Sequence, residues 1–119
     1  MVKQIIWSRL AQKDRFQILD YWINRNKSVS YSKKLNRIFE DTALLISKHP
    51  KIGKKTDVPD VRIKIVKDYF FTYRETEKSI EVLTIWDSRQ DPIKFERIIK
   101  KVAAKTQGSV SSTFKCNKD

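Results

Sequence analysis

The sequence predicts an α+β domain: an N-terminal strand, an antiparallel helical hairpin, a three-stranded antiparallel meander joining one sheet, and a C-terminal helix. β-Branched and aromatic residues dominate three consecutive runs between residues 61 and 87, which is typical of strands. Apolar residues recur at helical spacing in two segments before these runs and in one after them. We expect two layers, with the helical hairpin on one face of the sheet.

Four runs of the chain have the composition of strands. Short polar breaks separate the last three, and their length suits the connections of an antiparallel meander. The first run precedes the helices, and we expect it to join the sheet at an edge. In chain order, the strands are predicted at residues 3–7, 61–67, 69–75 and 79–87.

Serines mark the starts of the two helices of the hairpin. Ser8 suits the N-cap of a first helix at residues 9–25, and Ser28 or Ser30 opens the second helix. The second helix ends before Pro50, because proline disfavours helix at the residue that precedes it. The apolar face of this helix is the clearest periodicity in the chain. It consists of Tyr31, Leu35, Ile38, Thr42 and Leu45, flanked by Phe39 and Ile46.

A third helix is predicted after the meander. Asp91 caps it, and Pro92 takes its first position, where the missing N–H is harmless. Its apolar stripe ends near Ala104 and consists of Phe95, Ile98, Ile99 and Val102. Beyond it the composition turns to threonine, glutamine and serine, so we expect a single domain at residues 1–104 and a flexible tail at residues 105–119.

Composition excludes several classes of protein. A length of 119 residues suits one domain. The single cysteine, Cys116, excludes an internal disulfide and fits a reducing cytoplasm. No apolar run approaches membrane-spanning length, no secretory signal is seen, and the two glycines exclude a glycine-rich phosphate loop. We expect a cytoplasmic protein that uses no membrane and no cofactor.

The formal net charge of +12 points to an anionic partner. An excess of positive charge gives information about binding partners rather than about the fold. The usual partners of a strongly basic domain are nucleic acid, the ribosome or an acidic protein. A solvated lysine-rich surface is the alternative. In the first strand of the meander, Arg62 and Lys64 alternate with apolar residues, so both lie on one face.

Further cations and aromatic side chains accompany these two residues. If the strands form a meander, the groups can converge on one concave face, where cations hold phosphates and aromatic rings stack on bases. The residues predicted to bind nucleic acid or another target are Lys51, Lys54, Lys55, Lys64, Arg74 and Trp86.

The sequence does not nominate a catalytic triad or a metal site. His49 is the only histidine, and its place beside a proline at a helix end favours a role in ending the helix. The acidic residues are scattered over predicted helix faces, whereas a metal needs several converging ligands. We therefore expect no metal.

The order of these pieces resembles the RelE/ParE superfamily of bacterial type II toxin–antitoxin toxins. The resemblance covers residues 4–92. It rests on the helical hairpin after a short strand, the His49-Pro50 turn into a lysine-rich loop, and the segments VRIKIVKDYFFTYRE and IEVLTIWDSRQDP. The last segment is similar to the family's closing strand, in which an apolar run leads to an arginine and then to Asp-Pro or Asn-Pro.

The resemblance implies a small basic toxin that a cognate antitoxin, acidic and partly disordered, neutralises. RelE-like members cleave mRNA in the ribosomal A site without metal, whereas ParE-like members poison DNA gyrase. Arg62 and Arg89 match two arginines of the family, and they are catalytic only if the protein is RelE-like. Where some nucleolytic members have a histidine, this chain has Trp86-Asp87, and no tyrosine follows Arg89. These departures favour the ParE-like branch.

Three hypotheses remain open at this point. The first is a toxin that inhibits growth by poisoning gyrase or blocking translation, with a metal-independent, ribosome-dependent mRNA endoribonuclease as its alternative form. The second is a non-toxic basic module that binds nucleic acid. The third is a relative that serves only to bind an antitoxin.

Overall fold

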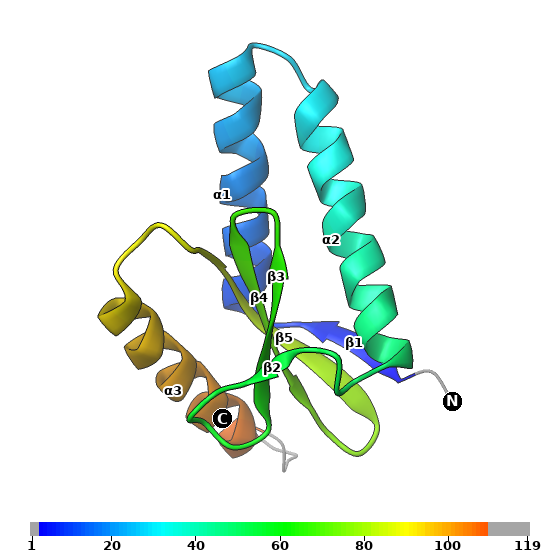
Figure 1. Cartoon of the computed structure of the whole chain (residues 1–119), viewed down its shortest axis with the longest axis vertical. Helices are drawn as coiled ribbons and strands as arrows, with labels where there is room; N and C mark the ends of the chain where they lie inside the picture. The colour runs from blue at the N-terminus through cyan, green and yellow to red at the C-terminus, as the bar shows by residue number, and fades with distance from the viewer. Residues whose placement is uncertain (1–2, 110–119) are drawn as a thin grey trace.

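The structure is a computed structural model that describes residues 3–109. This part of the chain forms three helices and five strands (Figure 1). In chain order they are β1 (Gln4–Trp7), α1 (Arg9–Asn26), α2 (Ser30–Lys48), β2 (Lys54–Lys55), β3 (Val61–Val66), β4 (Tyr69–Glu75), β5 (Ser79–Asp87) and α3 (Pro92–Ser109). None of the described helices is long and apolar enough to cross a membrane.

All five strands belong to one sheet with the order β1-β5-β4-β3-β2. The antiparallel meander of β3, β4 and β5 and the edge position of β1 confirm the prediction. Two features differ from it. β1 runs parallel to β5, and the lysine-rich loop adds the short strand β2, which is antiparallel to β3. The sheet is therefore mixed, because the long helical crossover lets β5 pair with β1 in the same direction.

The helices α1 and α2 form the predicted hairpin, which projects beyond the end of the sheet (Figure 1). Ser8 is the N-cap of α1, since its hydroxyl accepts a hydrogen bond from the Ala11 N–H at 3.0 Å. The same hydroxyl donates to the Leu83 carbonyl at 2.8 Å, which ties the start of α1 to β5.

The buried face of α2 is rotated from the predicted one. Leu45, predicted to be buried, is 39% exposed. The buried face consists of Ser32, Leu35, Phe39, Thr42, Ala43, Ile46 and Ser47. It packs on the side of the sheet that carries Phe71 and Tyr73.

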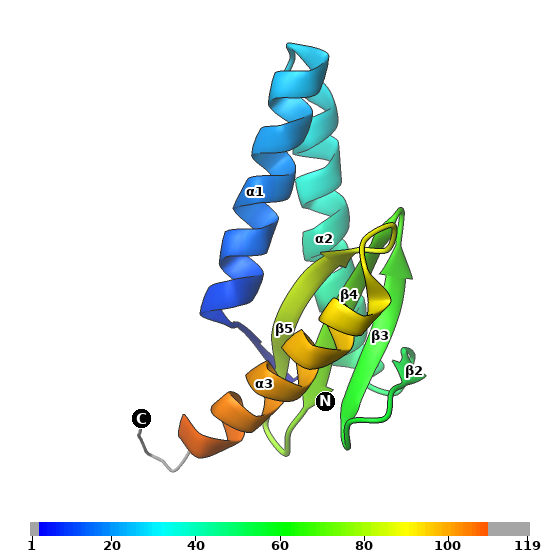
Figure 2. The same cartoon turned by 90° about the vertical axis from the view of Figure 1, so that its left-hand side faces the viewer.

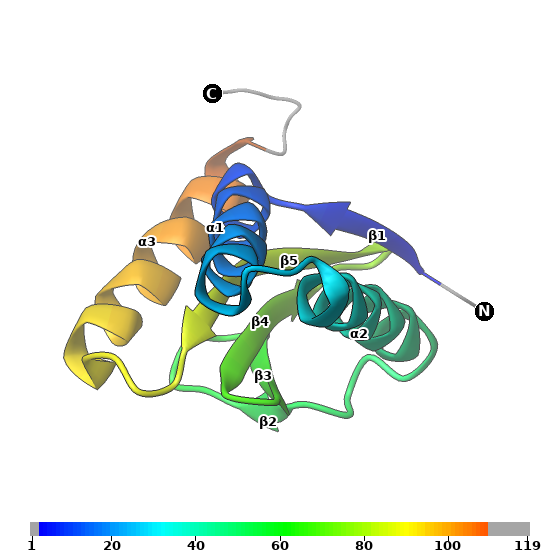
Figure 3. The ribbon, with the colours of Figure 1, turned by 90° about the horizontal axis from the view of Figure 1, so that it is seen from above.

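The third helix covers the other face of the sheet, so the expected two layers are in fact three. Figure 2 shows α3 in front of β4 and β5 with α2 behind the sheet, and Figure 3 shows the sheet between α3 and α2. The centroid of the Phe95 ring lies 5.3 Å from the ring centroid of Phe70 and 5.8 Å from that of Trp86. The helix continues to Ser109, beyond the predicted end at Ala104. The remainder of the predicted tail, residues 110–119, lies outside the described residues.

Candidate functional site

The predicted site residues gather in two places rather than one. Lys51, Lys55 and Arg62 line a cavity of about 400 Å³ beside the loop before β3, which we call the loop site. Trp86 and Arg89 line a cavity of about 390 Å³ at the end of β5, which we call the strand-end pocket.

The two sites lie at opposite ends of the meander. Arg62 on β3 is opposite Tyr73 of β4, whereas Asp87 at the end of β5 is opposite Tyr69. Along β4 these positions are roughly 13 Å apart at the usual rise of a strand, and Arg89 lies two residues beyond Asp87. The expected convergence of both arginines on one concave face is therefore not found.

The loop site is organised around Arg62 and Tyr73. The Nη1 of Arg62 donates to the carbonyl oxygens of Gly53 at 2.9 Å and Lys51 at 3.3 Å. The Tyr73 hydroxyl donates to the Pro50 carbonyl at 2.7 Å and accepts from the Gly53 N–H at 2.9 Å. Burial raises the pKa of Tyr73 above its ordinary value of 10.0, which keeps this hydroxyl protonated. Arg62 thus holds the loop backbone in addition to any role in binding.

An acidic side chain partly neutralises the loop site. Glu75 pairs with Lys51 at 3.0 Å and with Lys3 at 3.1 Å. The hydrogen bond from Lys51 is the main cause that holds the pKa of Glu75 below its ordinary value of 4.5. An anionic ligand at the loop site would therefore compete with Glu75 for Lys51.

The side chains of three predicted cations have no hydrogen bond or ion pair within the described part of the chain: Lys54, Lys55 and Lys64. Lys54 and Lys55 are exposed on β2. Lys64 is half-buried on β3, on the same face as Arg62. Cations without a partner are available to an anionic surface, so these three residues fit the predicted binding role.

Arg74, in contrast, is part of the core and not of the exposed basic set. It is buried, and its Nη2 lies 2.6 Å from the Glu81 carboxylate on β5. Its Nη1 donates to the Ala103 carbonyl of α3 at 3.1 Å. The sequence placed Arg74 among the target-binding cations, but the docking of α3 removes its guanidinium from solvent.

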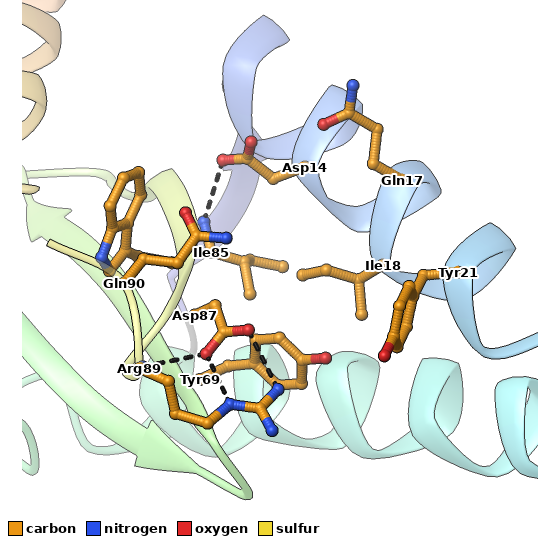
Figure 4. Close-up of a pocket in the computed structure, with 10 residues that line it drawn as sticks. Asp14, Gln17, Ile18, Tyr21, Tyr69, Ile85, Asp87, Arg89 and Gln90 are labelled. Carbon is orange, nitrogen blue, oxygen red and sulfur yellow. Dashed lines mark hydrogen bonds and ion pairs between the residues drawn. The ribbon is translucent and has the colours of Figure 1, made fainter. Parts of the chain in front are cut away.

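The strand-end pocket contains an arginine that folds back on a neighbouring carboxylate (Figure 4). The Nε and Nη2 of Arg89 each lie 3.0 Å from an oxygen of Asp87, and the Arg89 N–H donates to the same carboxylate at 2.9 Å. These bonds hold the pKa of Asp87 below its ordinary value of 3.8. The Arg89 side chain is 62% exposed, so its remaining N–H groups are accessible to a ligand.

The other side of the strand-end pocket comes from α1, which contributes Asp14, Gln17, Ile18 and Tyr21. The carboxylate of Asp14 accepts hydrogen bonds from the Thr84 hydroxyl and from the Ile85 N–H. β1 pairs with β5 only as far as Val82. Beyond that point, the Asp14 carboxylate accepts the hydrogen bond from the Ile85 N–H that a neighbouring strand would otherwise accept. Burial raises the pKa of Asp14 above its ordinary value of 3.8.

Aromatic side chains complete this pocket. Trp86 packs on Phe95 of α3, and its indole N–H is buried and has no partner among the described residues. The Tyr69 hydroxyl accepts a hydrogen bond from the indole N–H of Trp22 at 2.9 Å. Trp86 is therefore a wall of the pocket rather than an exposed platform for stacking.

The residues that α1 supplies to this pocket were not predicted from the sequence. A signal was present, because Asp14 interrupts the apolar stripe that contains Ala11, Ile18 and Trp22, and a carboxylate on a buried helix face requires a hydrogen-bond donor. Its donors lie on β5, about 70 residues away in sequence. No group of three or more histidine, cysteine, aspartate or glutamate side chains that could hold a metal ion occurs among residues 3–109.

The fold occurs in a known toxin–antitoxin system. A solved structure of the chromosomal ParDE TA system from P. aeruginosa is similar to this chain, with a TM-score of 0.63. The match covers 72% of this chain and 96% of that chain at 19% sequence identity, so it demonstrates a shared fold. The protein thus has the fold of that solved structure, a small α+β domain.

The sequence identifies the family more closely. The family model described as ParE toxin of type II toxin-antitoxin system, parDE, matches residues 5–92. The chain belongs to this family of ParE toxins, which confirms the resemblance to the RelE/ParE superfamily. None of the curated proteins matches the chain.

Proposed function

We propose that this protein inhibits growth by poisoning DNA gyrase and that a cognate antitoxin neutralises it in the cytoplasm. Membership of the ParE family supports the role of toxin. The separation of Arg62 from Arg89 is the observation that favours gyrase over mRNA as the target.

Metal-free cleavage of RNA needs cations and a proton-transfer group to act on the same phosphate. Here Arg62 is bound to backbone carbonyls and Arg89 to Asp87. No histidine lines either cavity in the described part of the chain. Neither site combines a histidine with an arginine that is free of an internal partner, so tight binding to a macromolecular target is the better-supported activity.

Three lysines without an internal partner support a place for the contact with such a target. Lys54, Lys55 and Lys64 have no partner in the described structure and can pair with carboxylates or phosphates of the target without loss of an internal bond. An acidic antitoxin is attracted to the same positive field.

The first experiment induces the chain alone in growing cells. We expect growth arrest, DNA breaks that depend on gyrase, and recovery when the neighbouring short open reading frame is co-expressed. Normal growth with soluble, folded protein would contradict the proposal, and would favour a non-toxic nucleic-acid-binding module or an antitoxin-binding scaffold.

The second experiment locates the contact with gyrase. Alanine at Lys54, Lys55 and Lys64 should weaken inhibition of purified gyrase at least tenfold, because these side chains have no hydrogen bond or ion pair within the described part of the chain and are available to the target. A matched control replaces three exposed helix lysines, Lys13, Lys33 and Lys34. The control should inhibit gyrase as the wild type does. An equal loss of inhibition in both variants would show that the lower net charge, and not the position of the lysines, causes the effect.

Cleavage of mRNA on ribosomes is the alternative function, and one observation favours it. Asp14 lines the same pocket as Arg89, and burial raises its pKa, as is common for carboxyl groups that transfer protons. Discrete A-site cleavage that is abolished by Arg89→Ala and by Asp14→Asn would establish the nuclease and overturn the gyrase proposal.

A further inference from the structure

The loop between α2 and β3 carries two of the lysines whose side chains have no partner among the described residues. Lys54 and Lys55 form the two-residue strand β2, which pairs with β3 at Ile63 and Arg62. A ladder of this length is only marginally stable without further contacts. The position of the two lysines therefore depends on what holds the loop around them.

Two side chains of the sheet bind the backbone that leads into β2. Arg62 of β3 and Tyr73 of β4 are directly opposite each other, so both side chains lie on one face of the sheet. The Arg62 guanidinium donates to the carbonyls of Lys51 and Gly53. The Tyr73 hydroxyl donates to the Pro50 carbonyl and accepts from the Gly53 N–H. Two neighbouring side chains thus hold this segment at four backbone atoms.

The contact between Tyr73 and Gly53 leaves little room for movement. Both residues are buried, and Tyr73 is 0% exposed. A Cβ at Gly53 would lie 2.7 Å from the hydroxyl oxygen of Tyr73 and 2.9 Å from its ring atom Cε1, which is closer than a side chain can come without a shift. Lys54 follows Gly53 directly in the chain, so any shift of Gly53 also moves the start of β2.

The cations of the loop site differ in what they bind. Lys51 is paired with Glu75 at 3.0 Å, and Arg62 is bound to two carbonyl oxygens. Lys54 and Lys55 are exposed, and no described residue pairs with their charges. A loop that is ordered before binding loses less conformational entropy when it binds. Arg62 is therefore engaged with the loop, whereas Lys54 and Lys55 are available to a partner.

We propose that Arg62 and Tyr73 are positioning residues, which hold the backbone of residues 50–53 so that Lys54 and Lys55 are presented to the target in one fixed arrangement. In this assignment Arg62 acts through the loop and not by its own contact with the target. The inference rests on the proposed function for the identity of the target, whereas the hold on the loop comes from the hydrogen bonds themselves.

The first test measures inhibition of purified gyrase by the full chain and by two variants that keep its charge. Tyr73→Phe removes only a hydroxyl. Arg62→Lys keeps the cation but lacks the fixed fork of guanidinium donors. We expect each variant to weaken inhibition by about tenfold, because the loop must then be ordered during binding. Unchanged inhibition by Tyr73→Phe would overturn the proposal.

Ser8→Ala is the matched control for the loss of a hydroxyl. The Ser8 hydroxyl also accepts from a backbone N–H and donates to a carbonyl, but at the start of α1. This variant should inhibit gyrase within about twofold of the wild type. Every variant is assayed where its urea unfolding curve shows fully folded protein. An equal loss of inhibition for Ser8→Ala and Tyr73→Phe would contradict the proposal.

A double-mutant cycle separates positioning from direct contact. In a chain with alanine at Lys54 and Lys55, the changes Arg62→Lys and Tyr73→Phe should each cause less than about a twofold further loss of inhibition, because the lysines that they position are absent. A general loss of stability would act equally in both backgrounds. A further loss as large as that in the wild type would show that Arg62 contacts the target itself, and the inference would be wrong.

Hydrogen exchange tests the hold on the loop without gyrase. Lys54 and Ile63 are opposite each other across β2 and β3. In Tyr73→Phe their amides should exchange about tenfold faster than in the wild type, since β2 then loses the support of the preceding segment. Exchange in α1 should stay the same. Equal exchange of Lys54 and Ile63 in both proteins would show that Tyr73 does not hold β2.

These outcomes separate a failure of this inference from a failure of the proposed function. If the wild type inhibits gyrase and Tyr73→Phe frees β2 without loss of inhibition, only the inference is wrong. If the wild type does not inhibit gyrase, the proposed function fails, and the same cycle read as growth arrest tests the inference for the target that the protein has. Absence of both activities would overturn the inference as well.

Discussion

Loss of the buried ion pair between Arg74 and Glu81 should destabilise the protein more than loss of any exposed pair. Both side chains are about 90% or more buried, and their closest atoms are 2.6 Å apart. Arg74→Met leaves the Glu81 carboxylate buried without a cation, which typically costs about 3–5 kcal/mol. It also removes the bond to the Ala103 carbonyl, worth about 1 kcal/mol. Against a total stability of about 5–15 kcal/mol, this loss is severe.

The measurement is urea unfolding of Arg74→Met, of the double variant Arg74→Met with Glu81→Leu, and of Arg89→Met. The double variant removes both buried charges, so we expect it to recover most of the loss. Arg89→Met breaks an exposed pair and should leave the midpoint almost unchanged. A loss for Arg74→Met as small as that for Arg89→Met would refute the assignment of Arg74 to the core. A double variant no more stable than the single one would show that the cost does not come from the uncompensated carboxylate.

Four further predictions concern the two candidate sites. Tyr73→Phe leaves the buried Gly53 N–H without an acceptor, and urea unfolding should show a loss of about 1–3 kcal/mol. Gly53→Ala places a Cβ only 2.7 Å from the Tyr73 hydroxyl oxygen, so it should destabilise by about 1–3 kcal/mol, and by less when Tyr73 is already phenylalanine. Burial raises the pKa of Asp14 above 3.8, so the folded protein holds this proton more tightly than the unfolded chain, and the contribution of Asp14 to stability falls as pH rises above 3.8. The free energy of unfolding, measured against pH, should fall less steeply above pH 3.8 in Asp14→Asn than in the wild type. An equal pH dependence in both proteins would contradict the reasoning. In NMR titrations the midpoint of Asp87 should lie below 3.8 and rise in Arg89→Ala, because the hydrogen bonds from Arg89 hold it down.

Features that depend on neighbours in sequence were predicted well. The meander followed from three β-rich runs and their short breaks, and β4 and β5 have the predicted bounds. The N-cap at Ser8 was also predicted, since capping involves residues within one helical turn. The face of α2 was predicted less accurately, because Leu45 and Ile46 are adjacent and only the contact with the sheet decides which of them is buried.

The binding role of the predicted cations stays a prediction. The side chains of Lys54, Lys55 and Lys64 have no partner among the described residues. Arg74 and Asp14 show the limit of that reasoning. The sequence shows a charge at each position, but the partner that neutralises Arg74 and the strand edge that Asp14 covers lie on β5.

The sequence by itself determined the α+β class, the toxin family and the excess of positive charge, because periodicity, motif order and composition are properties of the chain. The tertiary structure decided which cations are available. Packing of α3 on the second face of the sheet buried Arg74, and the register of β3, β4 and β5 placed Arg62 and Arg89 at opposite ends of the meander. The physical reason is that the availability of a charge depends on burial and on its nearest partner, and both come from segments distant in sequence.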